Sequence, residues 1–483
     1  TSTIKVNTIT TESGSTLTIG GCGKTVALAS GASQTGFGRS GSVDWQTTPK
    51  TSTFTAANGE GYFINSSGSI TANLPAGSAG AIVAFSDYAR NFNTHNFVIS
   101  PNGSEKIGGV AANLTLSVDG QALTLVYVDS TKGWVNVQNA EDTEQAETFI
   151  SASGGTESND GNFKVHTFTG PGTFSVSSIS GTAANNVVDY LVVGGGAGGG
   201  AGSANWTQGG GGGAGGYRTF VSNPTTSPKN APAGITVTAT SFPITVGAGG
   251  AGGTPPCAAG RGVSGNVSTF SSISSAGGGG GGAYSIPNGQ GANSGASGGG
   301  GGNACTGPGV PGAAGNTPPV SPSQGSNGGD ANRTFSGPIS YQNFAGGGGG
   351  ANAVGANGGP TSNCGTGGAG GAGEPNHITG SNVTYAGGGG GGGAGVANNP
   401  GSGTPIPGGA GLGGAGGGGN GATAGRTLNC VTWTPGGSGA AGTANTGGGG
   451  GGGAAVGDNV TPEFGIGGGA GGSGIVVIRY KFQ

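Results

Sequence analysis

Apolar and polar residues alternate along the first forty residues of the chain. Ile4, Val6 and Ile9 are separated by single or paired polar residues, and Leu17 and Ile19 continue the pattern after a Ser-Gly turn signal. A period of two is typical of β-strands with one buried face. Because each strand is too short and too weakly apolar to form a core alone, residues 1–40 are expected to be a β stem in which several chains join.

The same alternation continues through residues 41–140, interrupted by turn signals such as Asn58-Gly59 and Asp119-Gly120. Eight strands are predicted there: Thr53–Phe54, Gly61–Asn65, Ser69–Leu74, Ala81–Ser86, Asn96–Ser100, Leu114–Val118, Leu123–Val128 and Trp134–Gln138. This spacing of short strands is typical of a β-sandwich-like domain or a small barrel. The following residues, 141–160, begin with an acidic run and are expected to be a solvated linker.

Strand patterning returns in residues 161–193, which we expect to form a small β base. Its last strand, Val187–Val193, is strongly apolar and runs directly into glycine. Residues 475–483 are expected to be a closing β-strand, since Ile475–Tyr480 is equally apolar and leaves glycine equally abruptly. The two strands therefore bracket residues 194–474.

Glycine dominates this bracketed region: the chain of 483 residues contains 124 glycines, against roughly 7% in average proteins. The glycines form blocks, and the segments between them contain Phe, Tyr, Trp and Ile, which a flexible spacer does not need. In polyglycine II geometry, with about three residues per turn, backbone groups point outward and can bond to neighbouring helices. About twelve such helices are predicted, with essentially no α-helix: 194–202, 209–216, 247–253, 277–282, 296–302, 346–350, 365–373, 387–395, 408–419, 436–442, 447–453 and 467–474.

An even number of antiparallel helices returns the chain to its starting end. The strands Val187–Val193 and Ile475–Tyr480 are therefore expected to pair in one sheet. The connections near this base are expected at 217–246, 283–295, 351–364, 396–407 and 443–446. The connections at the distal tip are expected at 203–208, 254–276, 303–345, 374–386, 420–435 and 454–466.

A binding tip presents rigid aromatic side chains together with a few polar groups. The candidate receptor-binding residues in the distal loops are Trp206, Arg261, Arg333, Tyr341, His377 and Trp433. Aromatic faces beside Asn and Arg suit carbohydrate or protein surfaces, and the alternative is that the aromatic rings pack over the ends of the bundle. Two of the five cysteines, Cys257 and Cys305, share the tip and are a possible disulfide, whereas Cys364 is placed near the base.

Several classes of function are disfavoured by composition. Charged residues make up 7% of the chain and the net charge is −3, so the clustered Lys and Arg of a nucleic-acid site are missing. No apolar run reaches the ~18 residues of a membrane span. No paired carboxylates, His pair or complete phosphate-binding loop are present, so the sequence predicts no catalytic residues, no metal and no cofactor. Thr1 is interpreted either as exposed by removal of an initiator Met or as the start of a mature chain after signal cleavage.

Several stretches resemble the glycine-rich domains of virion proteins of tailed bacteriophages. They are Val187–Gly202, the aromatic-Ala-Gly runs at Phe344 and Tyr385, and the ending Gly474–Phe482. The opening Thr3–Gly31 looks like a fibre stem, and Gly61–Val137 looks like the β domain that commonly follows it. The glycine region is also similar in principle to the tail-fibre tip adhesins of T-even-like phages, in which polyglycine II helices carry receptor-reading loops.

The resemblance implies a non-enzymatic tail-fibre or adhesin subunit, located in the virion and released at host lysis. Its distal loops would bind host surface carbohydrate or an outer-membrane protein, and its stem would contact other virion proteins. Because this chain carries its own stem, a homotrimer is expected. A cellular extracellular adhesin or surface filament subunit is the alternative, and an ice-binding protein, which would need a flat Thr/Ala face, is a third.

Overall fold

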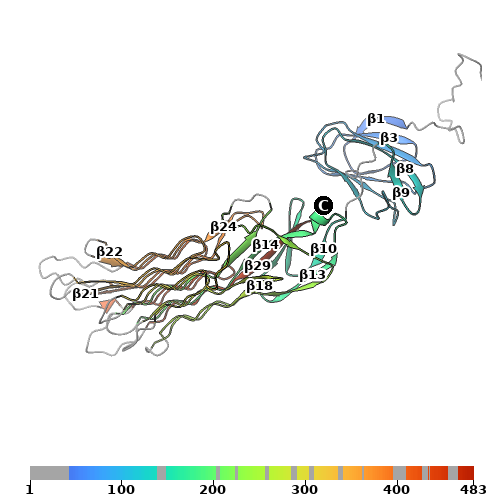
Figure 1. The fold of residues 1–483 in the computed structure, drawn as a ribbon. Coiled ribbons are helices and arrows are strands. Elements are labelled where there is room, and N and C mark those ends of the chain that lie inside the picture. Colours follow the sequence, from blue (N-terminus) through green and yellow to red (C-terminus); the bar gives the residue numbers. More distant parts are fainter. Residues whose placement is uncertain are drawn as a thin grey trace, which may run out of the picture. The chain divides into compact units, whose positions relative to one another are not determined.

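The computed structural model describes thirteen stretches of the chain: residues 43–138, 148–202, 207–222, 227–255, 260–283, 291–303, 309–335, 341–361, 364–394, 409–426, 433–434, 436–454 and 466–483. The expected stem, 1–40, and residues 141–147 of the expected linker lie outside this part. Two compact units divide between Ala146 and Glu147 (Figure 1). Each unit is described by itself.

Unit 1 is built from nine short strands in two sheets. They are β1 Asp44–Lys50, β2 Phe54–Thr55, β3 Glu60–Ile64, β4 Ile70–Asn73, β5 Ile82–Asp87, β6 Phe97–Ser100, β7 Leu114–Leu116, β8 Ala122–Asp129 and β9 Gly133–Asn136. One sheet has the order β1-β3-β5-β8-β9 and the other β2-β4-β6-β7. The first six strands alternate between the sheets, so neighbours such as β3 and β5 pair in parallel. In the first part of this sandwich-like domain, the chain therefore winds from one sheet to the other and back, instead of forming a series of hairpins.

The core of unit 1 lies between these sheets and consists of apolar side chains. Phe85, Phe92, Phe97 and Trp134 are completely buried and belong to one cluster of eighteen buried residues. Alternation along each strand produces this cluster, because every second side chain points inward. Trp134, in the last of these strands, is one of the largest side chains of this core.

Unit 2 begins with the β base, which also contains two sheets. The base strands are β10 Ser151–Ser153, β11 Thr156–Asp160, β12 Phe163–Phe168, β13 Gly172–Ser178, β14 Val187–Val193, β15 Tyr217–Phe220, β16 Ile235–Thr236, β17 Ser241–Thr245, β18 Ser268–Phe270, β19 Ile273–Ser275 and β29 Ile475–Lys481. Their orders are β11-β12-β29-β14-β15 and β10-β13-β17-β18-β19, with β16 beside β14. Residues 151–160, expected in the linker, instead form β10 and β11, because their serine and threonine residues pair with β13 and β12.

The predicted pairing of the two bracketing strands is confirmed. β14 and β29 are antiparallel neighbours, with Val193 opposite Ile475 and Asp189 opposite Arg479. The buried faces of both strands pack with Phe174 and Phe270 in one apolar cluster. The described residues contain a single 3-10 turn, Ala183–Asn186, and no helix in them is long and apolar enough to cross a bilayer.

Beyond the base, extended glycine segments bond to one another through their backbones. Successive N–H groups of one segment donate to three different partners: Gly194 to Gly216, Gly195 to Asn266 and Gly196 to Gly472, each at 2.9 Å. The pattern repeats every third residue, since Ala197 and Gly200 donate to the same segment as Gly194. We call these mutually bonded segments the glycine array.

The array has a regular layout around the segment 207–216, which bonds to six others. These six are 194–202, 276–283, 296–303, 345–351, 386–394 and 447–454. Outside them, the described residues form eleven more segments: 247–254, 260–266, 291–294, 309–315, 324–331, 353–358, 366–373, 409–415, 418–423, 436–443 and 466–474. In the described part of the chain, one central, six surrounding and eleven outer segments fill a hexagonal arrangement of two shells, in which one outer position has no segment.

The predicted number of about twelve segments was too low, because glycine density reveals only some of the outer segments. An outer segment packs against other segments on one side only. Because the direction repeats after three residues, glycine is required only at every third position. In 309–315 the glycines are Gly309, Gly312 and Gly315, and a Cβ on any of them would lie 2.1 to 2.3 Å from a backbone atom of segment 324–331. Residues between these glycines carry ordinary side chains, so the composition of such segments is typical of loops.

Because the described residues form more segments than predicted, some connections lie at the opposite end of the array from the expected one. Figure 1 shows β21 and β22 at the far end of unit 2, while β24 lies toward β14. β22 Gly359–Thr361 and β23 Cys364–Thr366 form a distal hairpin, although Cys364 was expected near the base. Conversely, β24 Glu374–Asn376 and β25 Val383–Tyr385 form a hairpin next to the base, although 374–386 was expected at the tip.

Candidate binding surface at the distal end

The distal end of the array carries strands where glycine gives way to residues with side chains. β20 Asn332–Phe335, β21 Tyr341–Phe344, β26 Gly393–Ala394, β27 Thr423–Arg426 and β28 Trp433–Thr434 form one sheet in that order. Antiparallel pairing places Phe335 opposite Tyr341 and Arg426 opposite Trp433. The sheet gives the distal end a fixed frame on which the intervening connections are mounted.

Three of the predicted receptor-binding residues lie on this distal frame. Arg333 is on β20, Tyr341 on β21 and Trp433 on β28, and the structure describes their backbone only. Trp206, Cys257 and Cys305 lie outside the described residues, so their proposed roles stay predictions. The two aromatic-Ala-Gly runs pack inside the protein, since Phe344 and Tyr385 are 0% and 5% exposed.

Arg261 is held by the array itself. It lies on the outer segment 260–266, and its Nη1 donates to Oδ1 of Asn293 at 2.8 Å. Asn293 Nδ2 in turn donates to Ser264 Oγ at 3.4 Å. The guanidinium therefore takes part in a contact between two array segments, and its predicted receptor-binding role stays a prediction.

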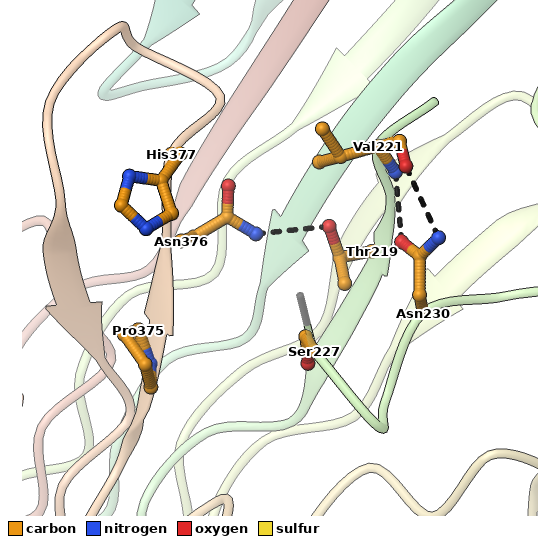
Figure 2. A pocket seen from close by; sticks show the side chains of 7 residues that line it. All are labelled: Thr219, Val221, Ser227, Asn230, Pro375, Asn376 and His377. Atoms are coloured by element: carbon orange, nitrogen blue, oxygen red, sulfur yellow. Dashed lines mark hydrogen bonds between the residues drawn. The ribbon is translucent and has the colours of Figure 1, made fainter. Parts of the chain in front are cut away.

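The prediction that His377 belongs to the tip is wrong, because the β24–β25 hairpin turns next to the base. Figure 2 shows His377 lining a small recess with residues of β15 and the following loop. The recess is lined by Thr219, Val221, Ser227, Asn230, Pro375, Asn376 and His377. Its free volume of about 10 Å³ has room for about one water molecule, so it is a packing gap and not a ligand site.

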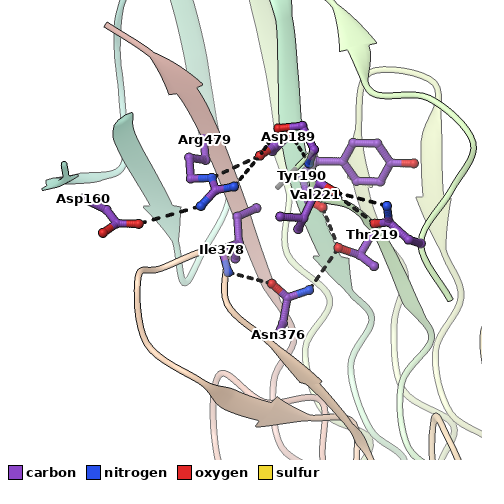
Figure 3. A network of polar contacts seen from close by, with 10 residues as sticks. Asp160, Asp189, Tyr190, Thr219, Val221, Asn376, Ile378 and Arg479 are labelled. Atoms are coloured by element: carbon purple, nitrogen blue, oxygen red, sulfur yellow. Dashed lines mark hydrogen bonds and ion pairs between the residues drawn. The ribbon is translucent and has the colours of Figure 1, made fainter. Parts of the chain in front are cut away.

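Asn376 fixes this hairpin to the base through both ends of its amide. Its Nδ2 donates to Tyr217 Oη at 2.7 Å and to Thr219 Oγ1 at 3.0 Å, while its Oδ1 accepts from the N–H of Ile378 at 2.8 Å (Figure 3). Thr219 Oγ1 donates onward to the carbonyl of Tyr190 at 2.9 Å. Burial raises the pKa of the Tyr217 phenol, so it stays a neutral hydrogen-bonding group.

A second polar contact next to Asn376 involves Glu374, which is 3% exposed. Ser227 Oγ donates to Glu374 Oε1 at 2.7 Å. Burial lowers the pKa of Lys229, whose Nζ donates to the carbonyl of Ser323 at 3.0 Å, and the Glu374 charge partly offsets that shift. These contacts connect the base to the array.

One buried ion pair in the base was not predicted from the sequence. Arg479 Nη2 lies 2.7 Å from Asp189 Oδ2, and Asp189 also accepts bonds from the N–H and Oγ of Ser222 (Figure 3). Asp160 lies 3.7 Å from Arg479 Nη1. The sequence did contain a signal for this pair. Asp189 and Arg479 each interrupt an apolar strand, at the same number of residues from the adjoining end of the glycine-rich region.

The comparison with protein families identifies the larger part of the chain. Residues 169–481 match the family model described as a glycine-rich domain, and the chain belongs to that family. Among curated proteins, none matches the sequence significantly. Within the described ranges, no group of three or more His, Cys, Asp or Glu side chains is placed to hold a metal ion.

Proposed function

We propose that the chain is a non-enzymatic receptor-binding subunit of a tailed-phage fibre, in which the glycine array is a bundle of polyglycine II helices. The bonding pattern supports the helix assignment. Successive N–H groups address three different neighbours and the direction repeats after three residues, as expected of a helix with about three residues per turn. The resemblance to phage adhesins noted in the sequence supports the role of the bundle.

The observation that carries the functional proposal is the asymmetry between the two ends of the array. Toward the base, connections are short turns such as 294–296 and 351–353, or strands and hairpins packed on the base. Toward the distal end, the chain leaves the array at 202, 283, 394 and 454 and re-enters it at 207, 291, 409 and 466, so these connections vary in length. A stiff platform with varied connections at one end suits surface recognition.

The proposed ligand is host surface carbohydrate or an outer-membrane protein, contacted by the distal connections together with β20, β21 and β28. Aromatic residues such as Trp206, Tyr341 and Trp433 supply flat apolar faces, and Arg333 supplies charged hydrogen-bond donors. Stem-mediated homotrimers would present three distal ends, which raises avidity without any new contact. Attachment to other virion proteins is assigned to the stem.

The test is binding of the purified full-length chain to a glycan array and to immobilised outer membranes from a panel of bacteria. Trp206→Ala combined with Trp433→Ala is expected to weaken the strongest binding at least about 10-fold, the usual effect of removing an aromatic anchor. His377→Ala, which alters an aromatic side chain near the base, is the matched control and is expected to change nothing. Binding that survives the distal substitutions and is lost with His377→Ala refutes the distal site.

Immunolabelling separates the phage proposal from a cellular adhesin. An antibody to residues 194–474 is expected to label fibre tips on virus particles. Label along filaments on the cell surface would instead assign the chain to a cellular adhesin.

A further inference from the structure

Among the residues that the structure describes, one position of the hexagonal layout has no glycine segment. Among the six segments around the centre, five bond to six neighbours each, whereas 276–283 bonds to five: 194–202, 207–216, 260–266, 291–294 and 296–303. On its sixth side, in the part of the chain that the structure describes, the N–H groups of Gly277 and Gly280 have no acceptor. The missing position lies between the outer segments 260–266 and 291–294.

Side chains from these two flanking segments meet over the gap. Arg261 Nη1 donates to Asn293 Oδ1 at 2.8 Å, and Asn293 Nδ2 donates to Ser264 Oγ at 3.4 Å. Gly280 is buried although no glycine segment covers its outer side. These three side chains, which we call the Arg261 bridge, therefore shield a backbone edge that would otherwise face solvent.

The gap differs from the rest of the outer surface in how many neighbours it offers. A strand added to a flat side of a hexagonal layout contacts two existing segments, whereas a strand in the gap would contact three. Exposed rows of unpaired backbone groups are templates for the addition of another chain. The gap is thus the place where an extended glycine-rich strand, for example from a second copy of this chain, would bind best.

We propose that the Arg261 bridge takes the place of a nineteenth glycine segment and closes the array against strand addition. The bridge links the side chains of Arg261, Asn293 and Ser264 by hydrogen bonds and covers the amides of 276–283, while presenting no continuous backbone edge to a partner. This role is independent of what the distal end binds. It assigns Arg261 to the integrity of the array rather than to receptor recognition.

The test is to remove the bridge from the full-length chain by combining Arg261→Gly with Asn293→Gly. The probe is a soluble, fluorescently labelled peptide with eight glycines flanked by lysines. The double variant is expected to bind the peptide at least about 10-fold more tightly than the unaltered chain, which corresponds to about 1.4 kcal/mol. Val263→Gly, which removes an exposed side chain from the same segment, is the matched control and is expected to bind no better than the unaltered chain.

Hydrogen exchange gives a second reading that needs no peptide and no double variant. In Asn293→Ala, the amides of 276–283 are expected to exchange at least about 10-fold faster than in the unaltered chain, because their cover is gone. Added peptide is expected to slow exchange again in the double variant. Unchanged exchange in Asn293→Ala, or a folded double variant that binds no peptide, overturns the proposal.

Discussion

Unit 1 and the glycine array are both tightly packed, but the interior of unit 1 is made of side chains and the interior of the array is made of backbone. The core of unit 1 consists of large side chains, among them Phe85, Phe97 and Trp134, packed between two sheets. The interior of the array consists of backbone, with neighbouring segments so close that a Cβ on Gly212 would lie 2.2 Å from the carbonyl oxygen of Ala197. A folded interior therefore requires complete packing and satisfied polar groups rather than apolar side chains as such.

The largest loss of stability is expected from one methyl group added at the centre of the array. Gly212→Ala is expected to lower the free energy of unfolding of unit 2 by at least about 5 kcal/mol, because the surrounding backbone carbonyls cannot move aside as a flexible side chain would. Calorimetry of the full-length chain measures the effect. Gly437→Ala is the control, since the nearest atom to its Cβ would be 3.7 Å away, and a similar loss there would contradict this view.

The opposite change, removing a side chain, is expected to damage unit 1. Phe97→Ala leaves a cavity in a completely buried position and should cost about 4 kcal/mol. Only the calorimetric transition of unit 1 is expected to move, since the two units are separate compact bodies. An equal shift of both transitions would show that the units unfold together.

The base lies between these extremes, because its apolar core also holds a buried charge pair. Asp189→Asn leaves Arg479 without its carboxylate and is expected to cost about 3 kcal/mol in unit 2. Glu157→Gln changes a partly exposed ion pair with Lys164 and is expected to cost less than about 1 kcal/mol. Chemical denaturation of both variants gives the difference, and equal losses would argue against the buried pair.

The smallest expected effect is a pH dependence caused by His166, which is buried against Tyr480. Burial lowers the pKa of His166 below its usual 6.5, so the unfolded chain binds a proton more readily than the folded one. Stability is therefore fully present above pH 6.5 and falls as the pH drops, by at most about 1.4 kcal/mol per pH unit. His166→Gln is expected to flatten this slope in denaturation curves from pH 7.5 to 5, and a slope that persists would assign it to other groups.

Sequence patterns predicted the two kinds of interior and the pairing of β14 with β29, because alternation and glycine blocks are local signals. They failed for outer segments such as 309–315, where glycine at every third position is easily mistaken for loop composition. That error displaced His377 to the wrong end, since each missed segment reverses the direction of those that follow. The contacts of Asn376 with Tyr217 and Thr219 were not predictable, because they join residues about 158 positions apart whose meeting depends on the segment count.

The position of β29 in the base sheet has a consequence for synthesis. β29 lies between β12 and β14, so the middle of the sheet is supplied after every array segment has been made. Its bond to Asp189 spans 290 residues. A ribosome must therefore translate the whole array before the base can close, and a chain that stops early keeps an open sheet edge for quality-control proteases to recognise.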